Sequence, residues 1–91
     1  MTYMLCRNRV SDFERWKSVF TSHKNAHREA GLHLSRIWRC VEDPDNVFFV
    51  FEVSSLEKAR AFINSANAAE AGAESGVVEG EYHFVEDAEG Y

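Results

Sequence analysis

The sequence predicts one small α+β domain whose elements follow the order β-α-β-β-α-β. Two apolar, strand-like runs, residues 3–10 and 47–53, are each followed at once by a Ser-x-x-Glu motif, at Ser11 and at Ser54. In a capping box the serine hydroxyl accepts a hydrogen bond from the third helical N–H, and the glutamate reaches back to the serine N–H. Helices are therefore expected to begin near residues 12 and 55, and another strand-like run closes the chain.

The first half of the domain has clear expected boundaries. We expect a strand over residues 2–10 and a helix over residues 12–30. Gly31 should end this helix, because a residue without Cβ adopts the left-handed backbone conformation at low cost. A second strand over residues 32–42 then turns at Asp43-Pro44-Asp45-Asn46, where proline suits the second position of a type I turn.

The second half repeats the strand-then-helix pattern. A third strand covers residues 47–53, and a second helix begins at Ser55 with its apolar residues on one stripe. Asparagine and serine, which are poor helix formers, should interrupt it near residues 64–67. A further helical piece over 68–74, a fourth strand within 77–87 and an acidic tail over about 87–91 complete a domain that spans residues 1–91.

The third strand has bulky apolar residues on both faces in the run Val-Phe-Phe-Val-Phe-Glu-Val. An antiparallel sheet normally leaves one face polar and in contact with water. Two helices can cover only one face, so the other is most simply covered by the same sheet of a second subunit. We therefore expect a homodimer that forms through the sheet faces.

Charge is divided unevenly along the chain. The net charge of −5 argues against nucleic acid and anionic membranes as partners. Residues 1–40 hold eight of the ten Lys and Arg against three acids, whereas residues 41–91 hold two against twelve. Strands that interleave in one sheet would explain this division, and an anion-binding face is the alternative. In the first case Arg7 and Arg9 would lie beside Glu79, Glu81 or Glu86.

The cysteines and the hydropathy favour a soluble, cytoplasmic protein. With the sheet order 4-1-3-2 that is typical of this element pattern, the third strand separates Cys6 from Cys40. Two strand spacings come to roughly 9.5 Å, beyond the reach of about 7 Å for a disulfide, so both thiols are expected to be reduced. No apolar run approaches the roughly 20 residues of a membrane span, and no signal-peptide pattern opens the chain.

Two histidines lie one helical turn apart on the apolar stripe of the first predicted helix. At 100° per residue, His23 and His27 fall within the apolar arc that includes Trp16. A buried neutral imidazole needs partners for its ring nitrogens, so the pair lines a satisfied core, a ligand cavity or a metal site. For a metal, Glu52 is the candidate third ligand, which would give a two-His, one-carboxylate set suited to non-haem iron.

Asn8 and Trp16 are the other candidate ligand-binding residues. Asparagine is disfavoured in strands, so the Asn8 amide is either hydrogen-bonded within the core or points into a cavity. Trp16 either packs in the core or forms a platform for a ligand. The sequence contains no Ser or Cys nucleophile motif, no glycine-rich phosphate loop and no Cys metal knuckle, and no cofactor is expected.

A family resemblance is carried by residues 10–20, 43–47 and 56–62, and by His23, Arg28, Gly31, Ser65, Gly76 and Val77. Through them nearly the whole chain resembles the superfamily of small dimeric α+β-barrel proteins, which includes antibiotic-biosynthesis monooxygenases, polyketide cyclases and many members without a known activity. The resemblance implies a ferredoxin-like monomer, dimerisation from sheet to sheet, and a pocket between the sheet and the helices.

Two branches of that superfamily bear on the candidate residues. Asn8 is similar in position to the first-strand asparagine of the haem-degrading branch, whose Trp and His on the second helix have no counterpart here. His23, His27 and Glu52 resemble the iron-binding His-x-x-x-His and later Glu of the sulfur oxygenase reductases, although the spacing to Glu52 is one residue off.

Three functions remain open from the sequence. In the first, a small apolar or aromatic ligand enters between the first helix and the sheet and is oriented by Asn8, His23 and His27. If it reacts there, the reaction is a cofactor-independent oxygenation or cyclisation in which imidazole acts as base on a phenol or enol. The second is a mononuclear metal site at His23, His27 and Glu52. The third is a non-catalytic dimeric module.

Overall fold

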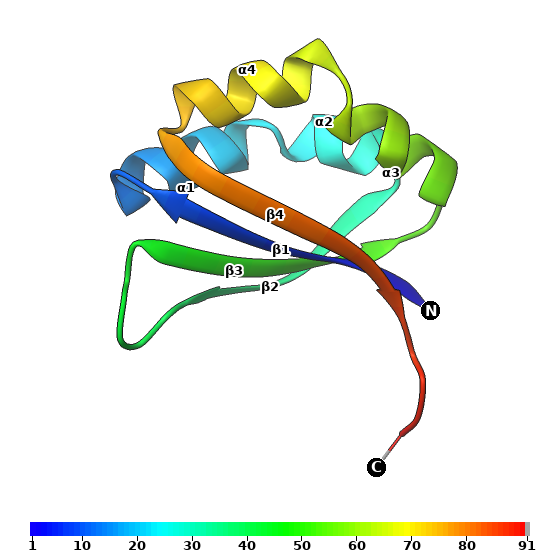
Figure 1. The fold of residues 1–91 in the computed structure, drawn as a ribbon. Helices are drawn as coiled ribbons and strands as arrows, with labels where there is room; N and C mark the ends of the chain where they lie inside the picture. Colours follow the sequence, from blue (N-terminus) through cyan, green and yellow to red (C-terminus); the bar gives the residue numbers. More distant parts are fainter. Residues whose placement is uncertain (91) are drawn as a thin grey trace.

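Residues 1–90, which a computed structural model describes, form a four-stranded antiparallel sheet with four helices on one of its faces (Figure 1). The sheet order β2-β3-β1-β4 confirms the predicted α+β, ferredoxin-like topology. The strands are β1 (Thr2–Val10), β2 (Leu32–Arg39), β3 (Asn46–Val53) and β4 (Val77–Glu86). The helices are α1 (Phe13–Ser22), α2 (Lys24–Glu29), α3 (Leu56–Ile63) and α4 (Ala66–Glu74). Of the predicted acidic tail, Tyr91 lies outside the described residues.

The helical segment predicted as continuous over residues 12–30 is two helices that meet at His23. This prediction was wrong, because the apolar stripe runs on across a residue whose backbone is not helical, with φ −96° and ψ 10°. Ser22 Oγ donates to the Val19 carbonyl at 2.6 Å, a local bond that competes with regular helix geometry. The interruption predicted near residues 64–67 is present, and α4 begins at Ala66, where Ser65 accepts a hydrogen bond from Ala68 N–H.

The two predicted capping boxes are shifted by one residue. Asp12 caps α1 by accepting from the N–H groups of Glu14 and Arg15, and Ser55 caps α3 by accepting from Lys58 N–H. The helices therefore begin at Phe13 and Leu56, close to the expected positions. The acceptors differ from those expected because the preceding serines, Ser11 and Ser54, form contacts across the fold instead.

Ser54, after β3, contacts Gly31, which follows α2. Ser11, after β1, contacts Gly76, which follows α4. Ser54 donates to the Gly31 carbonyl from its N–H at 2.9 Å and from its hydroxyl at 3.2 Å, and Ser11 does the same to Gly76 at 3.0 and 3.3 Å. Both glycines have positive φ, 74° and 78°, which confirms Gly31 as a helix stop. A Cβ would lie 2.8 Å from Ser54 Oγ at Gly31 and 2.5 Å from Ser11 Oγ at Gly76.

The residues of β3 alternate between the two faces of the sheet. Val47, Phe49, Phe51 and Val53 are buried under the helices and form the centre of the core. Phe48 and Val50, between them, are only half-buried, because no helix of residues 1–90 covers that face (Figure 1). Strand β2 ends at Arg39, earlier than predicted, and a bulge interrupts its pairing between Leu34 and Arg36.

The hairpin turn and the ion pairs follow the sequence patterns closely. Asn46 N–H donates to the Asp43 carbonyl at 3.0 Å and closes the turn around Pro44. Arg7 forms ion pairs with Glu79 and Glu81, as interleaved strands predict, and these bonds raise its pKa. Arg9 instead pairs with Asp43, at 2.6 Å, because the turn reaches the end of β1.

The cysteines are separated as predicted, since β3 lies between β1 and β2 in the sheet. Cys6 and Cys40, both within the described residues, are free thiols. Burial raises the pKa of Cys6 to about 12, so this thiol stays protonated and unreactive at neutral pH. No helix of residues 1–90 is long and apolar enough to span a membrane.

Candidate functional site

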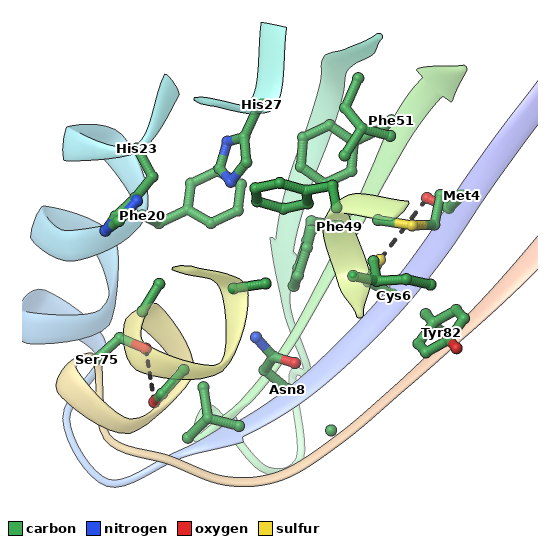
Figure 2. Close-up of a pocket in the computed structure, with 18 of the residues that line it drawn as sticks. Met4, Cys6, Asn8, Phe20, His23, His27, Phe49, Phe51, Ser75 and Tyr82 are labelled. Carbon is green, nitrogen blue, oxygen red and sulfur yellow. Dashed lines mark hydrogen bonds between the residues drawn. The ribbon is translucent and has the colours of Figure 1, made fainter. Parts of the chain in front are cut away.

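A cavity of about 250 Å³ lies between the helices and the helix-covered face of the sheet (Figure 2). Its floor is formed by Met4 and Cys6 of β1 and by Phe49 and Phe51 of β3, all of which are buried. Its walls come from α1 and α2 on one side and from α3 and α4 on the other. The lining is mainly apolar, with a few polar groups, which is the usual character of a small-molecule site.

The space exists because α4 presents small residues to the sheet. Ala68, Ala71 and Gly72 follow the i, i+3, i+4 spacing that places residues on one helical face, and all three line the cavity. A Cβ built on Gly72 would meet no atom within 4 Å. Larger side chains at these positions would fill the cavity, so the small residues of α4 keep it open.

His23 and His27 both line this cavity, as one of the sequence-based interpretations predicted (Figure 2). His27 lies among three phenylalanine rings, with centroid distances of 4.8 Å to Phe20, 5.2 Å to Phe51 and 5.6 Å to Phe62. Burial, and to a lesser extent the neighbouring charge of His23, lowers the pKa of His27 from 6.5 to about 4. Its imidazole is therefore neutral at neutral pH.

The ring nitrogens of these histidines are not bonded to other protein groups. Neither imidazole forms a hydrogen bond within residues 1–90, and every fully buried side-chain nitrogen or oxygen there has a partner. The ring nitrogens that have no partner are therefore not fully buried, and they are exposed to the cavity or to solvent. A histidine satisfied within the core would instead be bonded to protein atoms, so the geometry favours the cavity-lining interpretation.

The Asn8 amide lies between the Trp16 indole and the Arg7 carbonyl. We assign its oxygen and nitrogen in the orientation that satisfies both groups, the reverse of that drawn in Figure 2: Asn8 then accepts from Trp16 Nε1 at 3.1 Å, and its nitrogen donates to the Arg7 carbonyl at 3.0 Å. Trp16 is 1% exposed and packs against Phe20 and Phe49, with ring centroids 4.7 and 5.4 Å away. Asn8 is therefore hydrogen-bonded within the core, and Trp16 is a packed core residue. Both also line the cavity and hold its floor in place.

Glu52 does not join the histidines, and the predicted metal set at His23, His27 and Glu52 was wrong. Glu52 follows Phe51 on β3, so strand alternation places its exposed side chain on the sheet face away from the helices. Within residues 1–90 no group of three or more His, Cys, Asp or Glu is placed to hold a metal ion.

The sequence reasoning missed the contribution of β4 and α4 to the site. Tyr82 and Gly80 of β4, the strand beside β1, line the cavity, and Gly80 pairs with Asn8 of β1. A Cβ at Gly80 would lie 3.0 Å from the Asn8 amide, so glycine leaves room for that side chain. The alternation of Gly80 and Tyr82, and the small residues of α4, are the signals that could have located this wall.

Comparison with known proteins identifies the fold. No protein-family model and no curated protein matches the sequence. Among solved structures, a "putative antibiotic biosynthesis monooxygenase" from Bordetella bronchiseptica is 15% identical with a TM-score of 0.76, over 96% of each chain. A protein of the same description from Caulobacter crescentus is 12% identical with a TM-score of 0.71, over 97% of this chain and 90% of that chain.

A third similar structure is an uncharacterized NIPSNAP domain protein from Burkholderia xenovorans. It is 10% identical with a TM-score of 0.67, over 97% of this chain and 95% of that chain. At identities this low, the structural similarity establishes the fold alone, and the activity must be argued from the site. The chain has the ferredoxin-like α+β fold of the antibiotic biosynthesis monooxygenase-like proteins, as the sequence resemblance implied.

Proposed function

We propose that this protein binds a small apolar or aromatic ligand in the cavity between its sheet and helices. The observation that carries the proposal is an apolar cavity of about 250 Å³ that is lined by two histidines, neither of whose imidazoles is hydrogen-bonded within residues 1–90. Burying one aromatic ring system removes roughly 150–250 Å² from water. At about 25 cal/mol per Å² this contributes roughly 4–6 kcal/mol before the costs of association.

His27 is the residue we assign to hydrogen bonding with the ligand. Because its pKa is lowered to about 4, the ring carries one N–H donor and one nitrogen acceptor at neutral pH. A ligand hydroxyl or carbonyl can therefore bond to it without the desolvation of a full charge. His23, one helical turn earlier, offers a second group to the same ligand.

We further propose that the reaction, if the ligand is a substrate, is a cofactor-independent oxygenation or cyclisation. In an oxygenation, an electron-rich phenol or enol supplies a CH2 group, which O2 converts to C=O with release of one water. In a cyclisation, the enol carbon forms a bond to a carbonyl carbon of the same molecule while the π bond of that carbonyl breaks. The proton taken from the enol is returned to the new alkoxide oxygen, and no oxidant is consumed. Three structures that share the fold are each described as a "putative antibiotic biosynthesis monooxygenase", which supports the first reaction.

Both reactions need a group that accepts a proton from the ligand, and an unprotonated imidazole is such a group. A neutral histidine can accept the hydroxyl proton of a phenol or enol, and the anion formed beside it raises the imidazole pKa again by attraction. The apolar walls then keep water away from the anion. We assign the base role to His27 or to His23, and a variant of each distinguishes them.

We also propose that the protein is a homodimer joined through the sheet face opposite the helices. Leu5, Trp38 and Val85, from three different strands, are 40%, 45% and 40% exposed on this face, next to half-buried Phe48 and Val50. A monomer would leave this apolar patch in water. Light scattering should show a dimer at micromolar concentration for the wild type and for Val41→Asp, and a monomer for Leu5→Asp. A monomeric wild type would contradict the proposal.

Thermal unfolding with a panel of phenols, naphthols and polycyclic ketones tests ligand binding. A ligand at about 100 times its Kd adds about 2.7 kcal/mol of stability, which raises Tm by roughly 11–22 °C for a domain of this size. Gly72→Leu, which fills the open space beside α4, should abolish the shift. No shift with any compound in the wild type, or equal shifts in both proteins, would contradict the cavity as a binding site.

Oxygen uptake and product analysis with the compounds that bind then test the reaction. We expect His27→Gln or His23→Gln to lower turnover by about a hundredfold, the scale of general acid–base catalysis, while binding changes little. Binding without any turnover would leave a ligand-binding module without catalysis.

A further inference from the structure

A second hollow, of about 350 Å³, lies beside the first, between α1, α2 and strand β2. The two spaces share four lining residues, Phe20, His27, Leu32 and Phe51. His27 thus lines both the apolar cavity and the second hollow. A ligand that fills the cavity and extends beyond His27 would have its far end in the second hollow.

The second hollow is basic, in contrast to the rest of the protein. Lys17 of α1 and Lys24 and Arg28 of α2 all line it, and the last two lie one helical turn apart. No Asp or Glu is among its lining residues, and His27 and His33 are the only other titratable residues among them. The protein as a whole carries a net charge of −5, so this local excess of cations is not a general property of its surface.

These three cations have no ion-pair partner within residues 1–90. Arg7 pairs with two glutamates and Arg9 with Asp43, whereas Lys17, Lys24 and Arg28 are among the Lys and Arg residues that form no ion pair there. Like charges held close together repel, and an anion between them removes that repulsion. The uneven charge of the sequence thus has two explanations in the structure: ion pairing at β1 and an unpaired basic cluster here.

We propose that the ligand is an amphipathic anion, whose aromatic or apolar body fills the first cavity and whose oxyanion end lies in the basic hollow beside Lys17, Lys24 and Arg28. This inference rests on the proposed function, because it presumes that the cavity holds a ligand. It adds the chemical class: a ring system that bears one carboxylate, sulfonate or phosphate group. His27, neutral and half-buried at the junction, bonds the middle of such a ligand without opposing its charge.

Two fluorescent probes with the same ring body separate the apolar contribution from the anionic one. N-phenyl-1-naphthylamine is neutral, and 8-anilinonaphthalene-1-sulfonate adds one sulfonate to it. We expect the wild type to bind both, with the sulfonate about tenfold tighter at low salt, since several exposed ion pairs contribute. This advantage should largely disappear in about 0.5 M NaCl, where screening is strong, while the affinity for the neutral probe is unchanged or slightly higher.

Matched variants locate the effect. Lys24→Gln and Arg28→Gln should each weaken the sulfonate probe about two- to fivefold and leave the neutral probe unaffected. Lys58→Gln removes the same charge from an exposed position on α3 that lines neither hollow, and should affect neither probe. Gly72→Leu should weaken both, which shows that the probes occupy the cavity rather than the open sheet face.

The outcomes distinguish the two proposals. Equal affinity of the two probes, or equal effects of Lys24→Gln and Lys58→Gln, would overturn the anionic assignment and leave the cavity as a neutral site. No binding of either probe would overturn the proposed function and this inference with it. Displacement of the neutral probe by naphthalene-1-carboxylate or 1-naphthyl phosphate, more strongly than by 1-naphthalenemethanol, would support the oxyanion and identify its type. Equal displacement by all three would contradict it.

Discussion

Acidification should weaken the fold through His27. Its pKa is lowered from 6.5 to about 4 in the folded protein, so between these values the unfolded chain binds a proton that the folded chain does not. The stability from this residue is complete above pH 6.5 and is lost as the pH falls toward 4. From about pH 7.5 to about pH 5.0 the loss is about 2 kcal/mol for a fully shielded ring. Because the ring is half-buried, screening by water reduces the loss to about 1 kcal/mol.

Urea unfolding followed by tryptophan fluorescence measures this loss, with the buried Trp16 as one reporter. The protein concentration is held constant, because a dimer would otherwise change its stability with dilution. Staying near pH 5 or above limits the contribution of carboxylates such as Asp43 and Glu81, whose pKa values are lowered by Arg9 and Arg7. His27→Leu keeps the other histidines, so its pH dependence should be smaller by about 1 kcal/mol. Identical pH dependence in the two proteins would refute a buried, neutral His27.

Two further predictions concern the frame of the site. Gly31→Ala should destabilise by about 1–2 kcal/mol, because Gly31 has φ 74° and a Cβ there would lie 2.8 Å from Ser54 Oγ. Gly72→Ala, at an open helical position, should instead stabilise by about 0.5–1 kcal/mol, and thermal unfolding of both variants tests the contrast. Asn8→Leu should cost about 1–3 kcal/mol by leaving the Trp16 N–H without its partner. Urea unfolding followed by circular dichroism should show smaller-than-additive losses when it is combined with Trp16→Phe, and additive losses would contradict the hydrogen bond.

The bounds of β1 and β3 were predictable because they follow local apolar runs, whereas β2 ends three residues earlier than expected. Strand β1 occupies Thr2–Val10, the range expected from its apolar run, and β3 differs by a single residue. The helix starts were less certain, because Ser11 and Asp12, or Ser54 and Ser55, are equally able to cap at sequence level. Gly76 and Gly31, which are distant in the chain, decide which residue caps each helix, because their carbonyl groups accept hydrogen bonds from the hydroxyls of Ser11 and Ser54.

The candidate site was partly predictable for the same physical reason. The helical period places His23 and His27 on one face, and the structure brings both to the cavity. Strand alternation should have excluded Glu52 from that group, since it follows the inward-facing Phe51. The bond between Asn8 and Trp16 and the hollow between Lys24 and strand β2 depend on how the helices lie on the sheet, which spacing along the chain does not specify.

Contacts between a bound probe and labelled methyl groups test the central claim most directly. With N-phenyl-1-naphthylamine bound to methyl-labelled protein, we expect intermolecular nuclear Overhauser effects to Met4, Ala68 and Ala71, which line the cavity. Leu5 and Val85, on the opposite face of the sheet, should show none. Effects confined to Leu5 and Val85 would place the ligand on the open sheet face and contradict the cavity as the functional site.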